Sequence, residues 1–142
     1  MKDKQKLVED KGKINFPIDP EKFVKLLIDN LPIKIFWKDT ESVYEGANRA
    51  FCELGEIPEN VSIMGKSDLD MPWKDRSAKI FRIDDQEIMN SKEANLHIIE
   101  KIEGSEGNLM IKTSKIPLID ENGEVKGVLG FFWNYGSFRN EK

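Results

Sequence analysis

The chain has 142 residues, of which 39% are hydrophobic and 34% charged, with a formal net charge of -4. This is the size and composition of one globular domain, and no apolar run approaches the ~20 residues that span a bilayer. Mixed polar residues follow Lys2, Lys4 and Lys6, which excludes a secretory signal and favours a cytoplasmic location without membrane contact. The single cysteine, Cys52, excludes an internal disulfide, and the acidic balance argues against nucleic-acid binding.

The first third of the chain predicts a tail, a helix and a hairpin. Residues 1–19 have the composition of a charged tail or linker. Asp19 is a candidate N-cap and Pro20 a first helical residue. Apolar residues at helical spacing then predict a short amphipathic helix, ended by Pro32: Phe23, Val24, Leu27 and Leu31. The segments IKIFWKD and SVYEGA, separated by a polar turn at residues 39–41, predict two paired strands.

The rest of the chain predicts a helical block and then strands. Asn48 can cap a helix that ends at Gly55. Residues 65–72 predict a short helical turn and residues 73–92 the longest helix. Three extended apolar segments follow, separated by turns at residues 104–107 and at Asn122-Gly123. The order indicates an α+β domain with one antiparallel sheet covered by helices on one face.

Several local strings are typical of one family. FWKD, ANRAF, GKSDLDMPW, DDQEIMNS and TSKIPLIDENGEVKGVLG occur in the order and at the spacing of PAS sensory domains. The chain resembles this family from Leu27 to Asn134. The resemblance implies a domain over residues 20–136, followed by the start of a linker at 137–142. This domain would have a five-stranded antiparallel sheet with helices on one face and an N-terminal amphipathic helix. Asn134-Tyr135-Gly136 departs from the Asp-Ile-Thr ending that is common in the family.

The resemblance implies a sensory function for the chain. Such a domain is a non-catalytic signal input of a larger protein, and we expect a histidine kinase of a two-component system or a diguanylate cyclase as its effector. A small apolar ligand or a partner would shift it between two arrangements. The alternative is a ligand-free structural dimerisation module.

The resemblance also leads us to expect neither haem nor flavin. Haem-binding relatives use a histidine on the long helix, whereas His97 is on a predicted strand. Photoactive relatives carry a reactive cysteine where this chain has Asp68, and their flavin-facing asparagine and glutamine correspond to Ile111 and Phe132. Cys52 is expected to be a small buried apolar residue.

Two other features have ordinary structural interpretations. The acidic residues Asp68, Asp70, Asp84 and Asp85 lie in predicted helical segments, where capping and solvation are their common use, so we expect no metal site or catalysis. Gly127 and Gly130 mark either ligand approach or close backbone packing, and we favour packing.

Strand alternation, with its parity taken from the resemblance, separates two faces of the sheet. One face lines a ligand pocket, for which we predict Phe36, Phe51, Leu69, Phe81, Ile98, Ile111 and Phe132. The other forms an apolar patch too large for a stable monomer, because exposed patches rarely exceed a few hundred Å². The amphipathic helix can cover only part of this patch, so we expect a homodimer through Ile35, Trp37, Leu129, Phe131 and Trp133.

Overall fold

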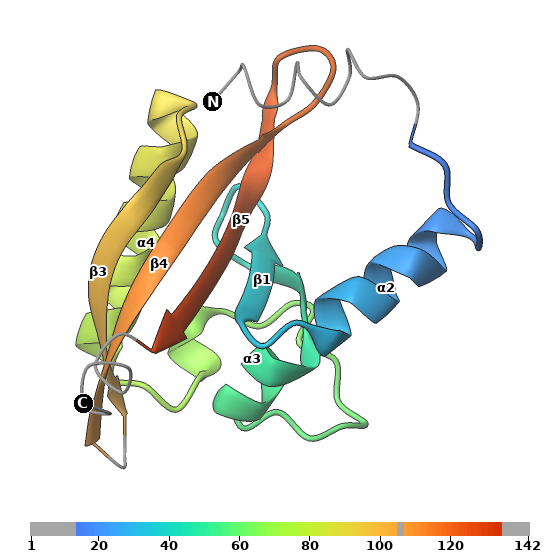
Figure 1. Ribbon diagram of the computed structural model, residues 1–142. Helices are drawn as coiled ribbons and strands as arrows, with labels where there is room; N and C mark the ends of the chain where they lie inside the picture. Colours follow the sequence, from blue (N-terminus) through green and yellow to red (C-terminus); the bar gives the residue numbers. More distant parts are fainter. Residues whose placement is uncertain (1–13, 105–106, 135–142) are drawn as a thin grey trace.

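The computed structural model describes residues 14–104 and 107–134 (Figure 1). The predicted order of helices and strands is confirmed. In chain order the elements are α2 (Pro20–Asn30), β1 (Lys34–Lys38), β2 (Tyr44–Ala47), α3 (Arg49–Leu54), the 3-10 turn η1 (Asp68–Asp70), α4 (Asp75–Ser91), β3 (Asn95–Gly104), β4 (Gly107–Ile119) and β5 (Val125–Asn134). Most of the predicted tail, the predicted exit linker and the departure at Tyr135-Gly136 lie outside the described residues.

The strands form one five-stranded antiparallel sheet in the order β2-β1-β5-β4-β3. The first and last strands of the chain, β1 and β5, are therefore neighbours near its centre, as the family resemblance implies. Helix α4 contacts β3, β4 and β5, and α3 contacts β1. In Figure 1 α4 lies behind β3 and β4, so the viewer looks onto the opposite side of the sheet. We call the side that α4 covers the inner face and the other side the outer face.

Asn48 joins three elements and explains why the helix begins where it does. Its Oδ1 accepts hydrogen bonds from the Phe51 and Ile35 amides at 3.1 and 3.0 Å. Its amide group donates to the Ile28 and Ile33 carbonyls at 2.7 and 2.9 Å. The predicted N-cap therefore also fixes the end of α2 and the start of β1. Both the carbonyl oxygen and the amino group of the buried Asn48 side chain are hydrogen-bonded.

The two strand glycines are packing positions, as predicted. A methyl group built on Gly130 would lie 2.2 Å from Cζ of Phe36, directly opposite in the β1–β5 pair. A methyl group on Gly127 would lie 2.0 Å from the Lys38 carbonyl oxygen. These contacts bring β1 and β5 together closely enough to fill the inner face with aromatic rings.

Helix α2 covers less of the sheet than its amphipathic pattern permits. Asp19 caps it as predicted, accepting from the Lys22 amide at 3.2 Å, but the helix has no buried residue. In Figure 1 it runs away from the sheet, with only its C-terminal end near β1. Phe23 and Leu31 are half-buried and Leu27 is exposed, so these three do not bury the outer face. Among the described residues, no helix is both long and apolar enough to cross a bilayer.

Candidate ligand cavity

A small cavity of about 20 Å³ lies between the inner face and the helices, with room for about one water molecule. Every strand and helix of the core contributes to its wall. The lining residues are Phe36, Lys38, Tyr44, Phe51, Asp68, Trp73, Phe81, Glu100, Ile102, Ile111, Thr113, Lys115 and Phe132. Five of the seven residues predicted for the pocket are among them, and the buried positions of Ile111 and Phe132 agree with the predicted register.

The other two predicted pocket residues lie elsewhere. Leu69 is 65% exposed, because η1 turns its neighbour Asp68 into the core instead. Ile98 is half-buried opposite Thr113 on the edge strand β3, next to an irregularity in the β3–β4 register. The β3 residues that reach the cavity are Glu100 and Ile102.

Aromatic rings form most of the apolar wall. Phe51 packs against Phe36, Tyr44 and Phe132 with ring centroids 5.2, 5.4 and 6.0 Å apart. Trp73 meets Phe81 edge to face at 6.3 Å. Such rings favour flat apolar surfaces placed against them.

A lysine–carboxylate cluster forms the polar wall, and we define it as Lys38, Lys115, Asp68, Asp85 and Glu100. Lys38 Nζ lies 2.6 Å from Asp68 Oδ2 and 2.8 Å from Asp85 Oδ2. Lys115 Nζ lies 2.9 Å from Asp85 Oδ1 and 3.7 Å from Glu100 Oε2. All five side chains are buried, and Asp85 is fully buried. Asp85 on α4 thus binds two strands to the helix through one carboxylate.

Within the cluster, Asp85 and Lys115 are held in their charged forms although both are buried. Burial raises the pKa of Asp85, but Lys115 and Lys38 outweigh it and hold that pKa below its ordinary value. Burial lowers the pKa of Lys115, but Asp85 and Glu100 raise it above its ordinary value. Opposite charges within hydrogen-bond distance favour both ionised forms, which is the condition under which buried charges are tolerated.

Two hydroxyl groups extend the cluster. Tyr44 donates to Asp68 Oδ1 at 2.6 Å, and burial together with Asp68 raises the pKa of Tyr44 well above its ordinary value. Thr113 donates to Glu100 Oε1 at 2.8 Å. Asp84, half-buried on α4, is hydrogen-bonded to Glu100, and burial with this contact raises the pKa of Asp84 to about 7.

Three of the four acidic residues expected to cap helices or face solvent therefore have a different role, and one of them is Asp84, which is half-buried against Glu100. Asp68 and Asp85 are core ion-pair partners, because two lysines enter the same space from β1 and β4. Asp70 does cap η1, accepting from the Ser67 amide at 2.8 Å. The sequence signal that was missed is Lys38 and Lys115 on the inner-face parity of their strands, where alternation predicts burial.

The comparisons with known proteins agree with this architecture. The family model of the PAS fold matches residues 28–140. The chain belongs to the PAS family. The family is one of sensory domains. The search of curated proteins found no significant match to the sequence.

Solved structures give the same fold. The phage VqmA–DPO complex shares 26% identity with this PAS domain at a TM-score of 0.68, over 85% of this chain and 55% of that one. The Vibrio cholerae VqmA–ligand–DNA complex shares 23% at a TM-score of 0.70, over 82% and 51%. A PAS domain from Colwellia psychrerythraea shares 14% at a TM-score of 0.66, over 84% and 99%. This chain thus spans about half the length of the VqmA chains.

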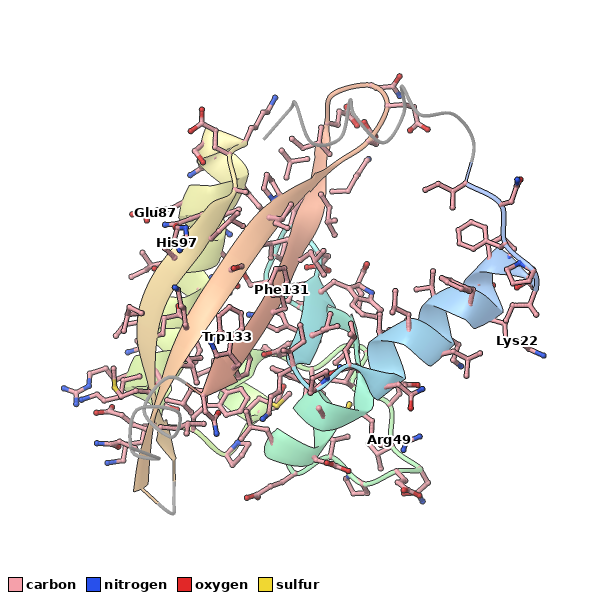
Figure 2. All side chains as sticks on the ribbon, viewed as in Figure 1. Lys22, Arg49, Glu87, His97, Phe131 and Trp133 are labelled. Atoms are coloured by element: carbon pink, nitrogen blue, oxygen red, sulfur yellow. The ribbon has the colours of Figure 1, made fainter. Side chains whose placement is uncertain are left out.

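The outer face of this PAS domain carries the predicted aromatic residues. Strand pairing places Trp37 opposite Leu129 and Ile35 opposite Phe131, and Figure 2 shows Phe131 and Trp133 along β5. Trp133 is 39% exposed, and Trp37, Leu129 and Phe131 are half-buried. Ile35 is the exception among the five predicted interface residues. It is buried, opposite Phe131 in the β1–β5 pair.

Other candidate residues lie away from the cavity. His97 is exposed on the edge strand β3 (Figure 2). Cys52 is half-buried beside the core aromatic cluster, and burial, with Asp29, raises the pKa of its thiol. Within residues 14–104 and 107–134, no group of three or more His, Cys, Asp or Glu side chains is arranged to hold a metal ion.

Proposed function

We propose that this PAS domain is the ligand-sensing input of a larger signalling protein and binds a small molecule in its inner cavity. The observation that carries the proposal is a cavity with an aromatic wall and a charged, hydrogen-bonding wall in one enclosed space. Structural cores are filled with apolar side chains, whereas ligand sites combine apolar surface with a few placed polar groups. The likeness to the phage VqmA–DPO complex, at 26% identity, supports it.

The lysine–carboxylate cluster changes the kind of ligand that we expect. The sequence predicts an apolar ligand, because Ile111 and Phe132 occupy positions that are polar in flavin-binding relatives. Lys38, Lys115 and Glu100 line the same space. A wholly apolar molecule beside them forms no hydrogen bonds with them, so the ligand we propose carries polar groups.

The effector belongs to the part of the protein beyond this domain. One Vibrio cholerae VqmA chain, about half of which this domain spans, was solved with a ligand and DNA, which makes a DNA-binding effector our first proposal. A PAS domain from a two-component sensor histidine kinase shares 17% identity at a TM-score of 0.59, so the likeness extends to the effector class that the sequence predicts. The expectations of no nucleic-acid partner and of a cytoplasmic location stay predictions.

One observation favours the alternative of a ligand-free structural module. The cavity has room for about one water molecule, so a ligand larger than that must displace side chains. The partly exposed outer face supports dimerisation in either case, and the Vibrio cholerae VqmA is described as a dimer. We propose a homodimer through Trp37, Leu129, Phe131 and Trp133, with Ile35 buried beneath it.

Mass spectrometry of gently extracted protein tests ligand binding. We expect a small molecule to be released from the wild type and lost from Ile111→Phe, which fills the cavity. The matched control is Ile99→Phe, at an exposed site on the neighbouring strand, which should retain the molecule. Equal release from both variants, or none from the folded wild type at any stage of purification, contradicts the proposal.

We also propose that the domain binds neither haem nor flavin. His97 is exposed at the sheet edge and Asp68 is already paired with Lys38 and Tyr44. The purified protein should show no Soret band and no flavin absorption in the blue, and either spectrum overturns this expectation.

A further inference from the structure

The inference concerns the chemical class of the ligand and rests on the proposed function. It starts from Trp73, which precedes α4 and is 6% exposed. Trp73 lines the cavity, and its buried indole N–H has no hydrogen-bond partner among the described residues. A buried indole N–H usually finds an acceptor, so this donor is available to a molecule in the cavity.

Glu100 offers the complementary group on the same cavity. Its Oε1 accepts from Thr113 at 2.8 Å. Protonated Asp84 is hydrogen-bonded to the same carboxyl group, so Oε2 has no donor among the described residues only when Asp84 is ionised, above its pKa of about 7. Lys115 Nζ is 3.7 Å away, which is an ion-pair distance but too long for a hydrogen bond. Glu100 is 7% exposed, so bulk water does not reach this oxygen freely. The residues around the cavity therefore offer one unused donor and, when Asp84 is ionised, one unused acceptor.

The charge of the wall selects against anions. The lysine–carboxylate cluster has two positive and three negative side chains, and both lysines already face carboxylates within 3 Å. A carboxylate ligand would add a negative charge beside Glu100 and compete with Asp68 and Asp85 for the same ammonium groups. In a buried site such like-charge contact is strongly unfavourable.

We propose that the ligand is a small planar molecule without negative charge, which accepts a hydrogen bond from the Trp73 indole and donates one to Glu100 Oε2. A planar aromatic ligand can pack offset or edge to face against the rings of Phe36, Phe51 and Phe132, which form the apolar wall and are inclined to one another by 41 to 78°. Three small heterocycles of similar size, used as probe ligands, test the acceptor and the donor of the proposed ligand separately. Pyrazole has an acceptor and an N–H donor, 1-methylpyrazole has the acceptor alone, and thiophene has neither useful group.

The probe titrations are followed on ¹⁵N-labelled protein, whose three tryptophans give three indole N–H signals. Trp73→Phe and Trp133→Phe assign the inner and outer signals. We expect pyrazole to move the Trp73 signal downfield and to leave the Trp133 signal unchanged. Removing a hydrogen bond to a charged acceptor costs roughly a factor of ten or more in affinity, so 1-methylpyrazole should bind at least about tenfold more weakly, and thiophene more weakly still.

Glu100→Gln is the matched variant, because it keeps the shape of the side chain and removes its negative charge. It should reduce the preference for pyrazole over 1-methylpyrazole, and formate should not shift the Trp73 signal in the wild type. Equal binding of pyrazole and 1-methylpyrazole overturns the donor half, because Asp84 then already satisfies Glu100. A formate shift overturns the charge argument.

Two outcomes separate this inference from the proposed function. If thiophene binds as tightly as pyrazole, ligand reception stands and the polar selection fails. If no probe shifts the Trp73 signal, the cavity holds at most a buried water, and both proposals fail.

Discussion

The two faces of the sheet invert the usual distribution of side chains. The inner face, under α4, buries Lys38 and Lys115 together with their carboxylates, whereas the outer face leaves Trp133 and part of Phe131 at the surface. Lys38 and Lys115 pair with Val128 and Gly130 of β5 in continuous register, so the inversion arises from which residues occupy the buried positions. Buried charges are tolerated where they are paired with opposite charges. Large apolar patches on a protein surface commonly mark sites where another molecule binds. The inner face meets its condition within the chain, and for the outer face we propose a second subunit.

The largest test of this contrast removes the carboxylate shared by both lysines. Asp85→Ala should destabilise the fold by about 3–5 kcal/mol, because it leaves two buried ammonium groups short of a partner. Asp75→Ala, at an exposed position in the first turn of the same helix, should cost less than about 1 kcal/mol. Urea unfolding measures both. Similar midpoints for the two variants would show that the cluster contributes little to stability.

Adding one methyl group to each face gives the next largest difference. Gly130→Ala places a methyl group 2.2 Å from the Phe36 ring, which Tyr44, Phe51 and Phe132 hold in place. We expect a loss of about 1–3 kcal/mol. Gly46→Ala makes an equally close approach to Trp37 on the outer face, but this half-buried ring has space to move. Thermal unfolding should therefore rank Gly130→Ala below Gly46→Ala, and the reverse order would contradict a rigid inner face.

The sequence predicts local features of this fold well and long-range side-chain contacts poorly. The caps at Asp19, Asn48 and Gly55 are local, since each depends on residues within a few positions, and all three were predicted correctly. The cluster was missed, because Asp68 and Asp85 meet Lys38 across 30 and 47 residues. Composition places an aspartate on a helix but does not reveal its partner on a distant strand.

The pocket residues, too, were only partly predictable from the sequence. Ile111 and Phe132 follow from strand parity once the family resemblance fixes it. Leu69 does not, because a three-residue turn gives no periodicity to decide which of two neighbours points inward. The small volume of the cavity depends on side-chain packing, which no sequence pattern contains.

Proton binding at the edge of the inner face should have a smaller effect. Burial and the contact with Glu100 raise the pKa of Asp84 from 3.8 to about 7. Between these values the folded state binds the proton more tightly than the unfolded state, so stability falls as pH rises and the loss is complete above about pH 7. Because Asp84 is only half-buried, solvent screening reduces the effect to the order of 1 kcal/mol.

Asp84→Asn removes this titration. The variant should be more stable than the wild type at about pH 8, and its melting temperature should depend less on pH between about pH 5 and 8. Asp75→Asn, on the exposed side of α4, is the control and should follow the wild type. Parallel curves for the wild type and Asp84→Asn would show that Asp84 ionises normally.

The smallest effect on stability should come from the outer face, where the effect on assembly should be the clearest. Trp133 lies at the surface of β5, so Trp133→Glu buries no charge in the monomer and should change its stability by no more than about 0.5 kcal/mol. In a dimer through this face the same glutamate enters an apolar interface, where an unpaired charge is costly. Sedimentation should therefore show a dimer for the wild type and a monomer for Trp133→Glu. Met64→Glu changes an exposed apolar residue in the loop before η1 and should stay dimeric. If all three proteins sediment as monomers, the proposed dimer through the outer face is wrong.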